Sequence, residues 1–69
     1  MNNTFLRYLV YECPASPGTS GRYIGQTPIK EQAVSAVNNH NERRAEDGYT
    51  YPAWFIYGLT PSGEKVIFL

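Results

Sequence analysis

What this chain of 69 residues lacks already narrows the classes to which it can belong. It has one cysteine and one histidine, so we expect neither an internal disulfide nor a multi-cysteine zinc site, and a reducing compartment fits best. It has no basic, apolar leader and no apolar run long enough to span a membrane. We therefore predict a cytoplasmic protein that makes no use of a membrane.

Charge is scarce as well. Charged residues make up 17% of the chain, and six basic residues balance six acidic ones. Proteins that bind nucleic acid usually carry a clear positive excess, so we do not expect nucleic acid as a direct partner. The apolar fraction of 42%, with one tryptophan, six tyrosines and three phenylalanines, predicts a folded domain rather than a disordered tail.

The length of the chain predicts a single domain, residues 1–69, with a thin margin of stability. A chain this short buries only about 60% of the surface that its unfolded form exposes. Pairing into a homodimer, or docking on a larger partner, would add to that margin.

Residues 27–46 form the one segment that is long and periodic enough to predict a helix. Thr27 is expected to cap it, Pro28 to take the first helical position, and Asp47-Gly48 to end it. A polar run in its second half leaves open whether the helix is kinked there or ends early. Its predicted buried stripe is Ile29, Ala33, Ala36 and Val37, with Val34 at the edge, and consists largely of the small residues alanine and valine. A helix of this kind must lie close to a bulky, aromatic sheet.

Four apolar segments predict the strands of that sheet: residues 5–12, 22–26, 49–58 and 64–69. Both faces of the first strand are apolar, with Leu6, Tyr8 and Val10 on one and Phe5, Leu9 and Tyr11, with Arg7 among them, on the other. This indicates a central strand or one whose outer face is also covered, and we expect it to pair with the second strand in a hairpin. Gly25 marks a bulge or a close backbone approach, and the loop 14–21 is expected to be exposed and mobile. The fold class is α+β, ββαββ, with one helix on a small, mainly antiparallel four-stranded sheet whose strand order stays open.

Two tripeptides, residues 9–11 and 23–25, resemble the paired motifs at the start of the GIY-YIG nuclease domain. The resemblance implies that Tyr11 and Tyr23 position or activate water. Leu9 stands where the family has glycine, and Gln32 or Ala33 stands where it has a helical arginine. The alternative that follows is a minimal or degenerate nuclease.

The remaining polar residues predict no catalytic set, no metal site and no cofactor. His40 is the lone histidine and is interpreted as a polar residue at the margin of the helical stripe. Cys13 precedes a proline and has no activating neighbour in the sequence. Glu64 follows a turn and is expected to be solvated.

Surplus aromatic and arginine side chains predict a protein-binding surface, because tyrosine, tryptophan and arginine are the usual anchors of such surfaces. The predicted binding residues are Arg7, Tyr11, Arg22, Tyr23, Arg43, Arg44, Trp54 and Tyr57. A base-stacking platform for single-stranded nucleic acid is the alternative use of the same rings.

The layout of strand hairpin, single helix and strand hairpin in a small neutral chain is similar to that of small phage- or mobile-element-encoded inhibitors, among them several anti-CRISPR proteins. The resemblance implies a non-enzymatic module in the host cytoplasm. Its partner would be a host protein complex, such as a CRISPR effector, that it blocks sterically.

Overall fold

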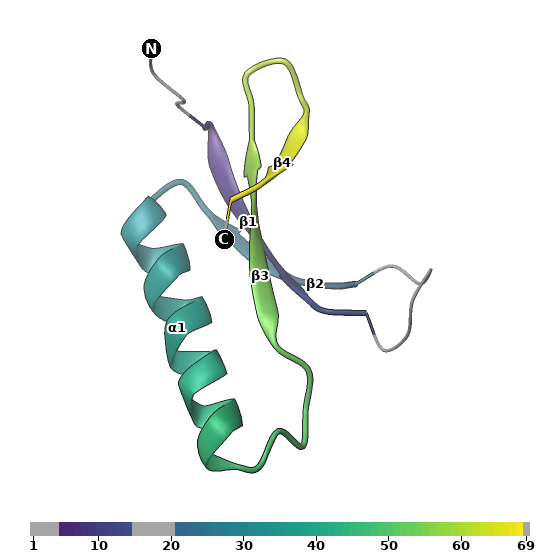
Figure 1. Cartoon of the computed structure of the whole chain (residues 1–69). Coiled ribbons are helices and arrows are strands. Elements are labelled where there is room, and N and C mark those ends of the chain that lie inside the picture. Colours follow the sequence, from purple (N-terminus) through teal and green to yellow (C-terminus); the bar gives the residue numbers. More distant parts are fainter. Residues whose placement is uncertain (1–4, 15–20, 69) are drawn as a thin grey trace.

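A computed structural model of the chain describes residues 5–14 and 21–68 (Figure 1). The elements are β1 (Arg7–Glu12), β2 (Arg22–Thr27), α1 (Lys30–Glu46), β3 (Trp54–Leu59) and β4 (Lys65–Ile67). The strands form one antiparallel sheet in the order β2-β1-β3-β4, and α1 packs on one face of it. The predicted ββαββ architecture and the central position of the first strand are confirmed. Within the described residues, no helix has the length and apolar character needed to cross a membrane.

The hairpin of β1 and β2 contains a bulge, which was one of the two explanations offered for Gly25. Val10 pairs with Gly25 and Tyr11 pairs with Tyr23, so Ile24 is the extra residue of β2. A Cβ atom at Gly25 would have no neighbour within 4 Å, so a close backbone approach is not the reason for this glycine. The loop predicted to be exposed and mobile falls mostly on residues 15–20, which lie outside the described part of the chain.

The start of α1 differs from the prediction. The helix begins at Lys30 with Ile29 as its N-cap and without a side-chain cap, so the prediction of Thr27 as the cap and Pro28 as the first helical residue is wrong. Thr27 is the last residue of β2, and the chain needs Pro28 and Ile29 to turn from strand to helix. The Thr27 hydroxyl accepts a hydrogen bond from the Ile29 N–H at 3.1 Å and donates one to Gln32 Oε1 at 2.7 Å.

The rest of the helix runs without interruption to Glu46, through the polar stretch that left its length open. Its predicted stop is confirmed by Gly48, whose φ of 75° is the left-handed conformation common just after a helix. The Gly48 N–H donates to the Ala45 carbonyl at 3.2 Å, and the Tyr49 N–H donates to the Arg44 carbonyl at 2.8 Å.

The core lies between α1 and the two central strands. Its buried residues are Val10, Ala33, Val37 and Ile56, and the half-buried residues packed on them are Tyr8, Ile24, Val34, Trp54 and Phe68. The buried stripe of the helix is narrower than predicted. Ile29 is 47% exposed because it precedes the helix, and Ala36 is exposed because the helix rests on the sheet along Ala33 and Val37.

Two further predictions about the strands are corrected by the structure. Phe5 was placed on the same face as Leu9, but it lies before β1 and turns to the helix side, where its ring meets Tyr8 at 5.9 Å between centroids. A Cβ atom on Gly58 would lie 2.6 Å from the Phe5 ring, so glycine is what makes room for that ring. The third strand begins at Trp54, and residues 49–53 form a separate connecting segment.

Candidate binding surface on the open face of the sheet

The alternation of side chains along the strands gives the sheet a second face, opposite α1, which we call the open face. Within the described residues, no helix or strand packs on it. The register places its side chains in three rows across the strands: Tyr23, Tyr11 and Phe55; then Gln26, Leu9, Tyr57 and Ile67; then Arg7, Leu59 and Lys65. The open face therefore joins residues from all four strands.

Four rings on the open face form a continuous aromatic cluster. The Tyr11 ring is central, with its centroid 5.6 Å from Tyr23, 5.3 Å from Tyr57 and 6.0 Å from Phe55. The Phe55 and Tyr57 centroids are 5.1 Å apart. Three of these contacts are edge-to-face, an arrangement that aromatic rings favour and that holds them in place. Tyr23, 49% exposed, forms the outer margin of the cluster on β2.

Two cations lie on the same face as the rings. Lys65 Nζ donates a hydrogen bond to the Tyr11 hydroxyl at 3.2 Å and lies 5.3 Å from the centroid of that ring. The Arg7 guanidinium donates to the carboxamide of Gln26. Sequence reasoning missed Phe55 and Lys65 as surface residues. The alternation along residues 54–59 and 65–67 was the available signal, but it assigns a face only when the register is known.

The structure brings together four of the eight predicted binding residues, namely Arg7, Tyr11, Tyr23 and Tyr57. Arg43, Arg44 and Trp54 lie on the helix side of the sheet. Arg22 begins β2 and forms an exposed ion pair with Glu12 at 3.3 Å. The predicted set therefore does not form one surface.

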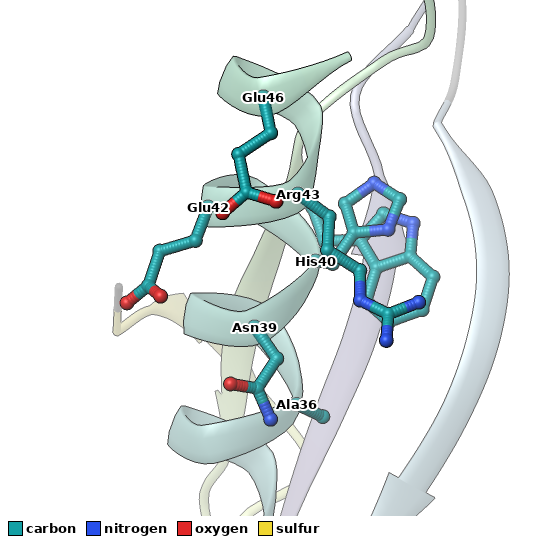
Figure 2. Close-up of a pocket in the computed structure, with 7 residues that line it drawn as sticks. Ala36, Asn39, His40, Glu42, Arg43 and Glu46 are labelled. Carbon is teal, nitrogen blue, oxygen red and sulfur yellow. The ribbon is translucent and has the colours of Figure 1, made fainter.

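The Trp54 ring contacts α1 and is not part of the open face. The His40 ring stacks on it with centroids 3.8 Å apart and an interplanar angle of 7°, while His40 Nε2 bonds the Pro52 carbonyl at 2.8 Å. Among the described residues, no acceptor reaches the buried Trp54 Nε1. Trp54 and His40 also line a hollow with Ala36, Asn39, Glu42, Arg43 and Glu46. Figure 2 shows the Glu42 carboxylate on the side of α1 away from His40, so the charged groups that line the hollow do not all point towards His40.

Asn41 and Arg44, on α1, form hydrogen bonds with the backbone of residues 51–54. The Asn41 carboxamide accepts the Trp54 N–H at 3.0 Å and donates to the Trp54 carbonyl at 3.3 Å. Arg44 Nε donates to the Tyr51 carbonyl at 2.5 Å, and its guanidinium lies 4.8 Å from the Tyr49 ring centroid. These side chains satisfy backbone groups of Tyr51, in the connecting segment, and of Trp54, the first residue of β3, which gives Arg44 a structural role.

The structure brings together the two tyrosines of the nuclease resemblance, but neither the lone histidine nor the glutamate after the 60–63 turn joins them on the open face. Tyr11 and Tyr23 are cross-strand neighbours, but His40 lies on the helix side and Glu64 lies in the turn before β4, where it accepts from the Ser62 hydroxyl. Residues 5–14 and 21–68 contain no group of three His, Cys, Asp or Glu residues that could hold a metal ion. No family model matches the chain, and comparisons with curated proteins and with solved structures found no match.

Among the described residues, one titratable group has a clearly shifted pKa, and it lies away from the open face. Partial desolvation and a 2.9 Å hydrogen bond to the Asp47 carboxylate raise the pKa of Tyr51 above its ordinary 10.0. We expect Asp47→Asn to lower this pKa towards 10.0, and Glu46→Gln, a weaker charge effect, to lower it less. Because the folded pKa is the higher one, the hydrogen bond stabilises the fold below pH 10.0 and is lost as pH rises through the folded pKa. Ultraviolet titration of tyrosinate, assigned with Tyr51→Phe, measures the shift.

Proposed function

We propose that the chain is a non-enzymatic protein-binding module that docks through the open face. The observation that carries the proposal is the cluster of four aromatic rings on a sheet face that no described element covers. Tyrosine is among the residues that contribute most to protein interfaces. Rings that already hold one another edge to face lose little side-chain freedom when a partner covers them, which favours binding.

In its finer form, the proposal gives the module an inhibitory role. A phage or mobile element would supply it, and the open face would occupy a site on a host complex, such as a CRISPR effector, and exclude the normal ligand of that site. The resemblance of layout to small inhibitors supports this choice of partner class. Fold alone does not determine function, so the partner must be identified by experiment.

A platform for single-stranded nucleic acid is the competing use of the open face. Such platforms offer ring faces on which successive bases stack. Here the Lys65 ammonium lies over the Tyr11 ring, and the Tyr23 and Tyr57 rings stand at 68° and 84° to it. The rings therefore form a mutually packed apolar surface rather than a row of parallel stacking faces, and we favour a protein partner.

Capture of a partner by matched tyrosine variants tests the proposal. Tyr23 and Tyr49 are both exposed, at 49% and 64%, but only Tyr23 lies on the open face. We expect the tagged protein to retain a stoichiometric protein from a nuclease-treated lysate. Because anchor residues contribute about 2 kcal/mol or more, Tyr23→Ala should weaken retention by more than about tenfold.

The Tyr49→Ala variant should retain the partner like the unchanged chain, and thermal unfolding of both variants checks that each is folded. Equal loss of the partner in the two variants would contradict docking through the open face. Recovery of nucleic acid alone, abolished by the nuclease, would replace the protein partner with a nucleic acid.

A further inference from the structure

Charge is divided unevenly between the two faces of this neutral chain. Among the side chains of residues 5–14 and 21–68, the open face carries two cations, Arg7 and Lys65, whereas none of the six Asp and Glu carboxylates lies on it. The carboxylates are Glu31, Glu42 and Glu46 on α1, Asp47 after it, Glu12 on the helix side of β1, and Glu64 in the turn before β4. Only four cations accompany these six carboxylates, so the molecule is positive on the open face and negative elsewhere.

Hydrogen bonds to neighbouring side chains fix both cations on the open face, Arg7 through Gln26 and Lys65 through Tyr11. Lys65 Nζ lies 3.2 Å from the Tyr11 hydroxyl oxygen and donates to it, which leaves the Tyr11 O–H able to donate to an incoming group. An ammonium and a hydroxyl this close can donate together to the two oxygens of one carboxylate, and hydrogen bonds to a charged group are the stronger kind. The Tyr11 hydroxyl and the Lys65 ammonium therefore form a pair of donors beside the aromatic cluster that suits a carboxylate.

We infer that the partner of the open face is an acidic protein segment. Its apolar side chains cover the aromatic cluster, one carboxylate meets Tyr11 and Lys65, and a second approaches Arg7. The inference rests on the proposed function and adds the chemistry of the partner to it. Charge complementarity of this kind guides encounter and selects among partners.

A phosphate backbone is the other anionic occupant to consider. Proteins that hold single-stranded nucleic acid combine stacked bases with a positively charged groove that follows the backbone. Among the described side chains, the open face offers only Arg7 and Lys65 as cations, and they lie on different strands. Two separated cations suit individual carboxylates better than a continuous row of phosphates.

Selection of peptides on the immobilised protein tests the inference with a defined probe. From a displayed library of random peptides, we expect sequences that combine Asp or Glu with aromatic or aliphatic residues. Two lysines give a matched pair of variants, because Lys65 lies 5.3 Å from the Tyr11 ring centroid and Lys30 lies 5.3 Å from the Phe68 ring centroid on the helix side. Lys65→Glu should weaken binding of the selected peptides by more than about tenfold, since like charges then face each other. Lys30→Glu should change it by less than about threefold.

A second variant, Lys65→Gln, should give an intermediate loss and covers the case in which Lys65→Glu does not fold. Selected peptides that are neutral or basic, yet depend on Tyr23, would overturn the acidic partner while leaving the proposed function in place. Peptides that bind equally well to the Tyr23→Ala and Lys65→Glu variants would overturn both. Tighter binding of a fluorescent oligothymidine than of any selected peptide would assign the open face to nucleic acid and overturn the inference.

Discussion

Replacing Ile56 by alanine is expected to remove most of the stability of this protein. Ile56, on β3, is 0% exposed and belongs to the core cluster with Val10 of β1 and Val37 of α1. Deleting a buried aliphatic side chain down to alanine costs about 2–5 kcal/mol, because apolar contact is lost and a cavity remains. Domains of this size have little stability in reserve. We expect the midpoint of thermal unfolding, followed by circular dichroism, to fall by about 10–40 °C.

Ile67 provides the matched control. It sits on β4 with 69% of its surface exposed, so Ile67→Ala deletes the same atoms without opening a cavity and should change the free energy of unfolding by less than about 0.5 kcal/mol. Equal losses in the two variants would contradict the core described above.

Replacing Asn41 by alanine is expected to have the next largest effect. The Asn41 carboxamide bonds both the N–H and the carbonyl of Trp54, at 3.0 and 3.3 Å, and alanine would leave both backbone groups without a protein partner. An unsatisfied polar group in a partly buried place costs about 1–3 kcal/mol. Chemical denaturation should show a loss of this size, and hydrogen exchange should show faster exchange at the Trp54 amide.

Asn38→Ala separates this loss from helix propensity. Asn38 is exposed in the same helix, so both substitutions gain the same few tenths of a kcal/mol from the better helix-forming residue. We expect Asn38→Ala to be neutral or slightly stabilising. A similar gain in both variants would mean that Asn41 does not hold β3.

The elements of the fold could be predicted because each depends on local chemistry. Gly48 ends the helix, the 60–63 turn closes with a 2.9 Å hydrogen bond from the Gly63 N–H to the Thr60 carbonyl, and Gly25 marks the bulge. The helix start was misplaced because Thr27 satisfies the local pattern of a cap while its backbone belongs to the sheet. The pairing of β2 with β1 places Thr27 in the sheet and not at the start of the helix.

The surface could be predicted only in part, because a list of exposed-looking residue types does not say which face each one joins. Trp54 and Tyr57 lie three residues apart on one strand, so they point to opposite faces, and only Tyr57 reaches the aromatic cluster. The polar residues of α1 were interpreted as a helix of uncertain length, whereas His40 and Asn41 bind backbone and rings of the connecting segment and of β3. Net charge also says nothing of where charges lie: a sum of zero is compatible with Arg7 and Lys65 on the open face and the six Asp and Glu side chains elsewhere.

The irregular edges of the sheet have a consequence for self-assembly. An exposed, regular edge strand can pair with the edge of another molecule and start aggregation. Here β2 is interrupted by its bulge, β4 is three residues long, and the Asn41 carboxamide occupies the backbone groups of Trp54 beyond the end of β4. Each edge thus offers too short a regular ladder to template growth of the sheet. Edges of this kind oppose edge-to-edge pairing in a protein whose open face carries four aromatic rings.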